Sequence, residues 1–529
     1  MRRNKRICFM FLFFTTLVFF LILRLYYIQI LKGDFYKQGA FFQKTGTVTE
    51  KVRGDILDRN GESLTGSYTV DYAIISWDWL SVSEKKLLMD NNIIGSIDDK
   101  NITTVKITPH NLDLLYQLNG RTPGVFIYNK KYRYGPKALA THIVGFQSET
   151  GIEKAFDGFL ESDMKEPYII NDGLGHPIAG LAVNQTKTQQ WGIKLTIDKR
   201  IQAIVEEIMD KKIKSGAVVV IDANSGEVLG MASRPNYKQF ELKDYLYQKN
   251  APLINRAVES YTPGSIFKIV VLSAALEENL AELNEVFYCS GFEKVGGNTF
   301  KCSSFDKGGH GEITLKDAMA FSCNSVFIQL GLRLGEQNIL KYARLFGLGE
   351  KTLADLPEEK EGNIPENNEV FYQDLGNISI GQGAIGITPI QSAQIMLTVI
   401  NDGVLKKPIL VKEIIDQHGN NLYSGLEEKS LKKILSRETC SEVRESLEAA
   451  TVYGTGRNAN PQNQQQIGGK TGTAETADNN SHAWFVGYFP ANNPKLVISV
   501  LVEKGGSGSV VAAPVFKEII DELIELENN

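Results

Sequence analysis

A serine and a lysine three positions apart, Ser265 and Lys268, have the residue types and spacing for covalent chemistry. A serine hydroxyl is a weak nucleophile that needs an adjacent base. A lysine becomes such a base when burial and neighbouring cations lower its pKa. Pro263-Gly264 predicts a turn and the apolar run 269–278 a helix, so both side chains would share a face near the positive end of that helix. Alone, Ser-x-x-Lys occurs by chance in most long chains.

A second polar segment, Ser322-Cys323-Asn324, supplies a hydroxyl and an amide. The hydroxyl of Ser322 is suited to relay a proton toward a leaving group, and the amide of Asn324 is suited to bind a substrate carbonyl. A polar helix cap or a buried turn accounts for the same residues without a catalytic role. This segment therefore indicates a catalytic role only in combination with other segments.

The third segment is Lys470-Thr471-Gly472-Thr473, which precedes a strand-like run and predicts an edge strand. We expect Gly472 to let the backbone of a ligand approach closely. Lys470 and the two threonine hydroxyls suit a substrate carboxylate. The N–H of Thr473 is a candidate oxyanion donor together with that of Ser265. An ordinary strand containing one glycine is the alternative explanation.

The elements around these segments predict one α+β domain over residues 192–529. Two β-rich runs predict a hairpin over 216–233, and a second hairpin is expected over 482–503. The amphipathic run 513–527 predicts a terminal helix. Because strands occur at both ends of the domain, we expect an antiparallel sheet that pairs early strands with late ones and is flanked by helices.

The N-terminus predicts a membrane anchor. Residues 7–30 are mostly apolar, and about 20 such residues span a bilayer. The tail 1–6 is rich in Arg and Lys, so the positive-inside rule places it in the cytoplasm and the rest of the chain outside. No small-residue cleavage site follows, which favours a retained single-pass anchor in the cell membrane over a cleaved signal peptide. Residues 31–191 show short mixed strands, helices and turns, and predict an irregular spacer domain.

The overall charge argues against nucleic acid as a partner. The net charge is −5, close to neutral for a chain of 529 residues, and no basic stripe is present. The composition is otherwise that of an ordinary globular protein. We therefore expect no nucleic-acid partner.

The three segments together resemble one family. Their order, Ser-x-x-Lys, Ser-x-Asn and Lys-Thr-Gly-Thr, is that of penicillin-binding proteins and class A β-lactamases, although Ser322-Cys323-Asn324 stands where β-lactamases have Ser-Asp-Asn. Over almost its whole length the chain resembles a monofunctional class B penicillin-binding protein. The other segments that carry this resemblance are Arg53–Gly61, Arg133–Pro136, His142–Gly145, Gly151–Glu153, Leu195–Asp198, Ile201-Gln202, Asn255–Ala257, Gly381–Gly383 and Trp484–Gly487.

The resemblance implies a peptidoglycan D,D-transpeptidase, with a penicilloyl-serine transferase domain behind a pedestal domain at 31–191. It implies that Ser265 attacks a stem peptide ending in D-Ala-D-Ala while Lys268 accepts the proton. The N–H groups of Ser265 and Thr473 would hold the oxyanion, and Ser322, with Lys470, would protonate the departing D-Ala. An amine of a neighbouring strand would then take the acyl group, whereas β-lactam antibiotics would acylate the serine and stay. No cofactor is required for this chemistry.

Other functions remain open from the sequence. A β-lactam-hydrolysing or β-lactam-sensing relative is opposed by the pedestal, and a non-catalytic scaffold is opposed by the intact motifs. Motifs alone do not separate transpeptidation from a D,D-carboxypeptidase that uses water as the acceptor. Only about 20 residues separate the anchor from Arg53, too few for a glycosyltransferase domain. The resemblance therefore implies that a polytopic membrane glycosyltransferase makes the glycan strand.

A possible metal site lies upstream of Ser322. Two thiols, a carboxylate and an imidazole in one short stretch suit tetrahedral Zn²⁺, and the glycines between them allow the loop to fold around an ion. A disulfide between the first two residues, or two free thiols, are the alternatives. We expect a structural Zn²⁺ that braces the wall carrying Ser322, with Cys323 as a packed small side chain and Cys440 without a partner. The candidate ligands are Cys289, Cys302, Asp306 and His310.

Overall fold

The structure is a computed structural model of the chain. It describes residues 2–32, 44–45, 53–94, 102–122, 124–146, 149–161, 169–171, 177–182, 192–353, 355–367, 369–416, 418, 420–424, 431–463 and 465–528. The parts of the predicted spacer domain that fall between these ranges lie outside the described residues.

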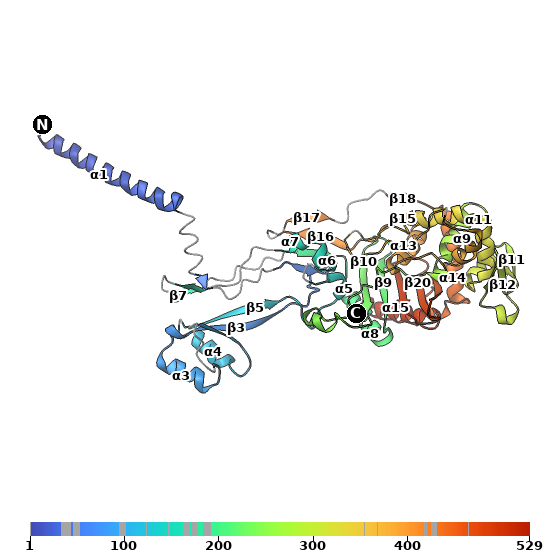
Figure 1. The fold of residues 1–529 in the computed structure, drawn as a ribbon, viewed down its shortest axis with the longest axis horizontal. Coiled ribbons are helices and arrows are strands. Elements are labelled where there is room, and N and C mark those ends of the chain that lie inside the picture. Colours follow the sequence, from blue (N-terminus) through green and yellow to red (C-terminus); the bar gives the residue numbers. More distant parts are fainter. Residues whose placement is uncertain are drawn as a thin grey trace. The chain divides into compact units, whose positions relative to one another are not determined.

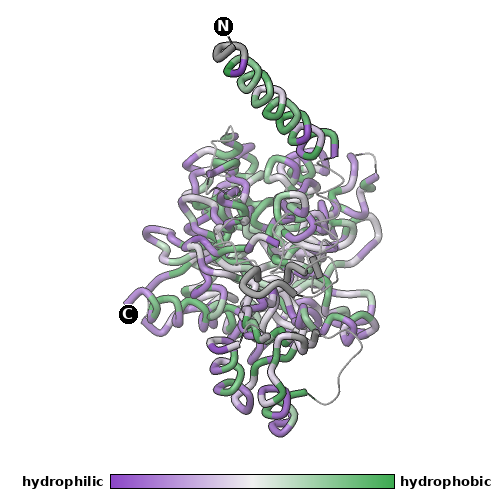
Figure 2. The backbone as a smooth tube through the Cα atoms, turned by 90° about the vertical axis from the view of Figure 1, so that its left-hand side faces the viewer, coloured by the Kyte–Doolittle hydropathy of each residue, from purple (hydrophilic) through white to green (hydrophobic). Residues whose placement is uncertain are grey.

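The chain begins with a long apolar helix, α1 (Arg2–Tyr26), which continues as a short π-helical segment (Tyr27–Leu31) (Figure 1). The stretch Arg6–Leu31 has a mean hydropathy of 2.4 and buries none of its surface in the protein. Figure 2 shows that this helix is hydrophobic along most of its length. Among the described residues it is the one helix long and apolar enough to cross a membrane. The helix agrees with the predicted anchor at 7–30.

The chain divides into two compact units, each of which is described by itself, and the first unit includes the N-terminal helix. In the first unit, β3 (Tyr68–Ser76) pairs antiparallel with both β4 (Ile102–Lys106) and β5 (Val125–Tyr132). Two helices, α3 (Val82–Asp90) and α4 (Leu112–Asn119), pack their buried leucines against this sheet. This unit also contains a small antiparallel sheet of β1 (Lys44–Thr45), β6 (Ile169–Asn171) and β7 (Pro177–Ala182).

The second unit is built on a five-stranded antiparallel sheet in the order β10-β9-β21-β20-β19. Strand β9 pairs with β10 in one predicted hairpin, and β20 pairs with β21 in the other. Strand β21 also pairs with β9, which confirms that early and late strands share the sheet. The strands are β9 (Gly216–Asp222), β10 (Val228–Arg234), β19 (Gly468–Glu475), β20 (Ser481–Phe489) and β21 (Leu496–Val502).

Helices cover both faces of this sheet because its strands are apolar on both sides. Val218, Val220 and Phe485 face a core formed with α8 (Lys199–Lys212) and α15 (Ala512–Asn528). The alternate residues of the same strands belong to the larger core on the other face. That core contains α9 (Lys268–Glu277), α11 (Asn324–Leu345), α13 (Pro389–Ile400) and α14 (Arg437–Val452).

Shorter elements complete the second unit. The additional strands are β2 (Asp55–Leu57), β8 (Gly192–Leu195), β11 (Val286–Cys289), β12 (Phe292–Val295), β13 (Asn298–Lys301), β14 (Gly311–Thr314), β15 (Val404–Leu405), β16 (Val411–Ile415), β17 (Asn421–Ser424) and β18 (Lys432–Lys433). The additional helices are α5 (Thr141–Val144), α6 (Gly151–Ala155), α7 (Asp157–Leu160), α10 (Leu315–Ala320) and α12 (Leu375–Ser379).

The compact units divide the chain differently from the predicted boundary at residue 192. Residues 54–67 and 133–160, expected in the spacer domain, belong instead to the second compact unit. Strand β2 pairs parallel with β8, and Arg133 pairs with the fully buried carboxylate of Glu153 at 2.5 Å. Long-range pairing of this kind leaves no local signal in the sequence. The segments that resemble pedestal motifs therefore hold elements of the second unit together.

Candidate active site

Ser265 lies in a tight turn that leads into a buried helix, as the sequence predicts. The turn is a 3₁₀ segment over Gly264–Ile266, and α9 begins at Lys268. Gly264 has φ of +53°, and a Cβ atom there would lie 2.5 Å from the carbonyl oxygen of Thr473. Only glycine lets the turn pack so closely on strand β19. Ser265 itself is partly exposed.

Lys268 is completely buried and points toward the second polar segment. Its Nζ donates to the carbonyl oxygen of Ser322 at 2.8 Å and to Oδ1 of Asn324 at 2.7 Å, and lies 3.4 Å from Oγ of Ser322. Burial lowers the pKa of Lys268 to about 8, because desolvation disfavours the ammonium form. A lysine with this pKa is suited to accept a proton near neutral pH.

Ser322 occupies the sharp turn between α10 and α11. Its φ of +56° places it in the left-handed region, which a serine adopts only when the surrounding packing holds it there. Asn324 starts α11 and donates from Nδ2 to the carbonyl oxygen of Lys301 at 3.0 Å. These contacts fix the Ser322 hydroxyl and the Asn324 amide on the same side as Lys268.

Lys470 approaches the same hydroxyl from the edge strand β19. Its Nζ donates to Oγ of Ser322 at 2.9 Å and to the carbonyl oxygen of Thr471 at 2.9 Å. Lys470 is fully buried, and burial, with a smaller contribution from the charge of Lys268, holds its pKa well below the usual range. Two buried lysines therefore converge on one serine hydroxyl, which can pass a proton in either direction.

Strand β19 lies at the edge of the sheet, as predicted, and Gly472 is closely packed by the turn that carries Ser265. A Cβ atom at Gly472 would lie 2.9 Å from Cγ1 of Ile266 and 3.0 Å from the carbonyl oxygen of Pro263. The glycine thus makes room for the turn that carries Ser265. Thr473 is exposed, and its Oγ1 accepts a hydrogen bond from the N–H of Gly508 at 3.4 Å.

Sequence reasoning missed Thr455, which extends this site. Its Oγ1 is hydrogen-bonded to Oγ1 of Thr471 at 2.7 Å, and its N–H donates to the carbonyl oxygen of Ala320 at 3.0 Å. A Cβ atom at Gly454 would lie 2.2 Å from the same carbonyl oxygen, so the glycine lets this segment pass the end of α10. A threonine between two glycines directly after a helix was the available signal.

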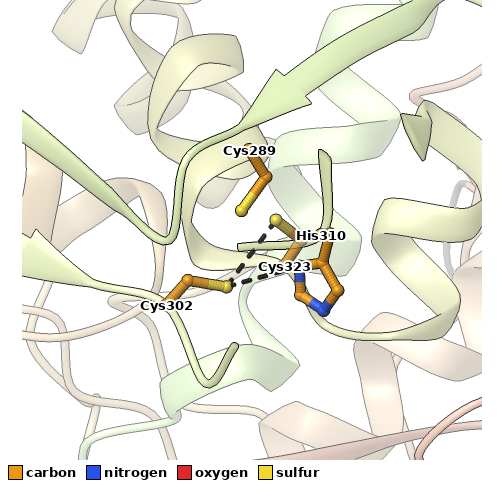
Figure 3. Close-up of side chains that lie close together, drawn as sticks. All are labelled: Cys289, Cys302, His310 and Cys323. Carbon is orange, nitrogen blue, oxygen red and sulfur yellow. Dashed lines mark hydrogen bonds between the residues drawn. The ribbon is translucent and has the colours of Figure 1, made fainter. Parts of the chain in front are cut away.

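A cluster of three thiols and one imidazole includes Cys323, the residue after Ser322 in the chain (Figure 3). The donor atoms of Cys289, Cys302, Cys323 and His310 all lie within 4.8 Å of one another. Sγ of Cys302 is 3.7 Å from Sγ of Cys323 and 3.6 Å from Nδ1 of His310. Ligands of a tetrahedral Zn²⁺ with Zn–S bonds of about 2.3 Å are separated by roughly 3.8 Å. The donor set and its spacing therefore fit zinc.

The structure corrects one predicted ligand. Asp306 is exposed on a 3₁₀ turn and is not part of the cluster, whereas Cys323, expected to be only a packing residue, supplies the fourth donor. The sequence did not reveal this because Cys323 lies at the start of α11, outside the loop that carries the other three ligands. The alternative disulfide between Cys289 and Cys302 is not formed, since both are free thiols.

The surroundings of the cluster favour the thiolate form of Cys302. The hydrogen bond between the two thiols lowers the pKa of Cys302 and raises the pKa of Cys323. Thiolates are the form in which cysteine binds metals. The buried position of three of the four ligands is typical of a structural rather than a catalytic metal site.

Known proteins share this fold and its order of elements. Residues 216–521, more than half of the chain, match the family model of the penicillin binding protein transpeptidase domain. Stage V sporulation protein D of Bacillus subtilis (strain 168) is 30% identical over 99% of this chain and 86% of its own length. Peptidoglycan D,D-transpeptidase PbpA of Mycobacterium tuberculosis (strain ATCC 25618 / H37Rv) is 27% identical over 77% of this chain and 86% of its own length.

The likeness extends to solved structures. A chain in "Structural coordination of polymerization and crosslinking by a peptidoglycan synthase complex" is 27% identical, covers 97% of both chains and has a TM-score of 0.74. The fold and these matches define the class: the chain belongs to the class B penicillin-binding proteins. It is a transpeptidase, an enzyme that transfers acyl groups through a serine.

Proposed function

We propose that this protein cross-links peptidoglycan stem peptides, with Ser265 as the nucleophile and a peptide ending in D-Ala-D-Ala as the donor. The observation that carries the proposal is that Lys268 and Lys470 converge on Ser322, with Lys268 three positions after Ser265 at the start of α9. We infer peptidoglycan as the substrate because curated relatives are named peptidoglycan D,D-transpeptidases. The loss of penicillin labelling in a Ser265→Ala variant tests the nucleophile.

Acylation requires two proton transfers, one from Ser265 and one to the leaving nitrogen, and different residues carry them out. Lys268, with a pKa near 8, takes the proton of Ser265 as its oxygen attacks the penultimate carbonyl. The N–H groups of Ser265 and Thr473 stabilise the oxyanion. Ser322, supplied with protons by the lysines, protonates the nitrogen of the departing D-Ala. A β-lactam acylates Ser265 by the same route and stays bound.

The substrate is held on the edge strand by polar groups around Ser322. Asn324 presents its amide to the donor peptide, and Lys470 with the hydroxyls of Thr471 and Thr473 attracts the terminal carboxylate. Thr455 fixes the orientation of the Thr471 hydroxyl through their hydrogen bond of 2.7 Å. This arrangement requires no cofactor for the chemistry itself.

We also propose that Cys289, Cys302, Cys323 and His310 hold a structural Zn²⁺. Cys323 lies between Ser322 and Asn324 in the chain, so an ion bound there would fix the turn that presents both groups. Zinc supplies no step of the reaction. It holds the thiolates together and so stabilises the folded wall of the site.

The purified full-length protein is expected to carry about one zinc per chain. Cys289→Ser should lose the metal, because it removes one of four ligands, and should lower the melting temperature by several degrees. Asp306→Asn is the matched control and should keep the metal, since Asp306 is outside the cluster. The zinc content of each protein is measured by inductively coupled plasma mass spectrometry. Zinc-free native protein, or zinc loss in Asp306→Asn alone, would contradict the assignment.

The membrane topology and the partner follow from the anchor. We propose that residues 1–6 are cytoplasmic, that 7–30 span the cell membrane, and that the catalytic domain lies outside. Glycan strands come from a polytopic membrane glycosyltransferase. The support is the similarity to a chain of a peptidoglycan synthase complex that coordinates polymerization and crosslinking.

Alkaline phosphatase fused after residue 40 should be active in cells, because that enzyme folds only outside the cytoplasm. A fusion after residue 5, before the apolar run, should be inactive and is the matched control. Enzyme activity is read from whole cells, with fusion levels compared by immunoblot. Activity of the second fusion alone would reverse the proposed orientation.

A further inference from the structure

The acceptor amine must reach the acyl-enzyme from the side on which D-Ala departs. The donor's acyl part stays attached to Ser265, and transfer of an amine is the reverse of the release of one. Ser322, which protonates the leaving nitrogen, is therefore the residue that the incoming nitrogen meets. Groups exposed next to Ser322 and away from the donor strand are the place to seek an acceptor site.

A hollow of about 370 Å³ begins one residue from Ser322. Phe321 forms one wall, β14 forms another, and the first turn of α10 supplies Asp317. Tyr453 lies against Phe321, with ring centroids 5.9 Å apart, and is 39% exposed. The residues that line the hollow are Val286, His310, Glu312, Ile313, Thr314, Asp317 and Phe321.

The chemistry of this hollow suits an ammonium group. Glu312 and Asp317 supply two carboxylates, and the partly exposed rings of Phe321 and Tyr453 offer faces that attract cations. Asp317 is fixed in place, because it accepts from the hydroxyl of Tyr453 at 2.7 Å and from that of Thr314 at 2.9 Å. Lys316 pairs with Glu445 at 2.6 Å and so leaves the carboxylate of Asp317 unneutralised.

The charges change sign between the hollow and Ser322. Carboxylates favour the protonated amine, whereas Lys268 and Lys470 beside Ser322 favour loss of its proton. An amine that moves from the hollow to Ser322 therefore arrives deprotonated, which is the nucleophilic form. Aminolysis needs the amine to be bound first and deprotonated second, and the hollow and the surroundings of Ser322 favour these two steps in that order.

We propose that this hollow is the subsite for the acceptor, a stem peptide that carries a primary amine on a side chain. The inference rests on the proposed transpeptidase function and names its second substrate site. The ammonium binds between the carboxylates and the rings and then gives up one proton to solvent water, which leaves the neutral amine. The free amine attacks the acyl carbon, the ester bond to Ser265 breaks, and the nitrogen's proton returns through Ser322 and Lys268 to the serine oxygen.

The test separates capture of the amine from formation of the acyl-enzyme. Full-length protein in detergent is acylated with a thioester analogue of the donor, with a lysine-containing peptide amide as acceptor. The ratio of aminolysis to hydrolysis is then measured. Glu312→Gln combined with Asp317→Asn should lower this ratio about tenfold through a higher KM for the amine. Salt should lower the ratio in the unaltered protein and much less in the double variant.

The control removes two charges elsewhere. Glu207→Gln with Glu522→Gln alters α8 and α15, which cover the opposite face of the sheet, and should leave the ratio unchanged. Labelling by a fluorescent penicillin shows that the donor site is intact in every variant. An unchanged ratio in the Glu312/Asp317 variant overturns the subsite. Acylation without any aminolysis in the unaltered protein contradicts the transfer reaction itself, which is a distinct result.

Discussion

Replacement of Ser265 by alanine should abolish covalent labelling of the protein by a fluorescent penicillin. The variant lacks the oxygen that forms the ester, and the described site offers no second serine at the same turn. Removal of a catalytic nucleophile commonly lowers turnover by about 10⁴-fold or more. Fluorescence of the band on a denaturing gel measures the label, because only a covalent adduct survives denaturation.

Ser260→Ala is the matched control for this substitution. Ser260 is exposed and lies five positions before the nucleophile, outside the turn that packs on β19. It should be labelled as strongly as the unaltered protein, and both variants should show the same melting temperature. Persistent covalent labelling of Ser265→Ala would overturn the assignment of the nucleophile.

Lys268→Met should lower the rate of acylation by about 10³-fold or more while the fold is kept. Methionine has a similar length and fills the same buried space, but it accepts no proton. The unaltered enzyme should acylate faster as pH rises, with a midpoint near the pKa of about 8. The variant should lose this rising limb. Stopped-flow acylation measures both effects between roughly pH 6 and pH 10, a range that extends above and below the pKa of Lys268.

The same substitution is expected to stabilise the protein at pH 7. The pKa of Lys268 falls from an ordinary 10.5 to about 8 on folding, a cost of about 3 kcal/mol. Between these two values the unfolded chain binds more protons, so stability rises with pH there, and the full cost is present below pH 8. The lost hydrogen bonds to Ser322 and Asn324 offset part of the gain. Urea unfolding of the variant should show a net gain and a flatter dependence on pH.

Lys307→Met controls for the loss of a lysine, because Lys307 is exposed and outside the site. It should change neither the rate nor its pH dependence. If Lys268→Met kept a rising limb with the same midpoint, another group would have to be the base, and Lys470 would be the first candidate because it reaches the same hydroxyl.

The three polar segments of the candidate site could be found in the sequence because each depends on local features. Ser265 and Lys268 share a face by helical spacing, and the two hairpins follow from alternating runs around turn residues. The apolar run at the N-terminus predicts a membrane anchor from length and composition alone. In each case the physical determinant lies within about 20 consecutive residues, which is the range that a sequence pattern can report.

The metal cluster shows where local reasoning fails. Cys289, Cys302 and His310 were found because they are close in sequence, and Asp306 was included for the same reason. The structure replaces it with Cys323, which the turn into α11 brings back to the loop. Likewise, the need for glycine at 472 depends on the distant turn at 263–266 that packs beneath it.

The sequence by itself determined the apolar N-terminal helix, the α+β class and the three polar segments that we propose to be catalytic, since residue types and short spacings specify them. Only the tertiary structure decided that two buried lysines meet at Ser322, that Cys323 completes the thiol cluster, and that an acidic, aromatic hollow adjoins the site. It also placed 54–67 and 133–160 with the catalytic domain. The physical reason is that burial and proximity between distant segments, which shift pKa values and gather ligands, exist only once the chain is packed.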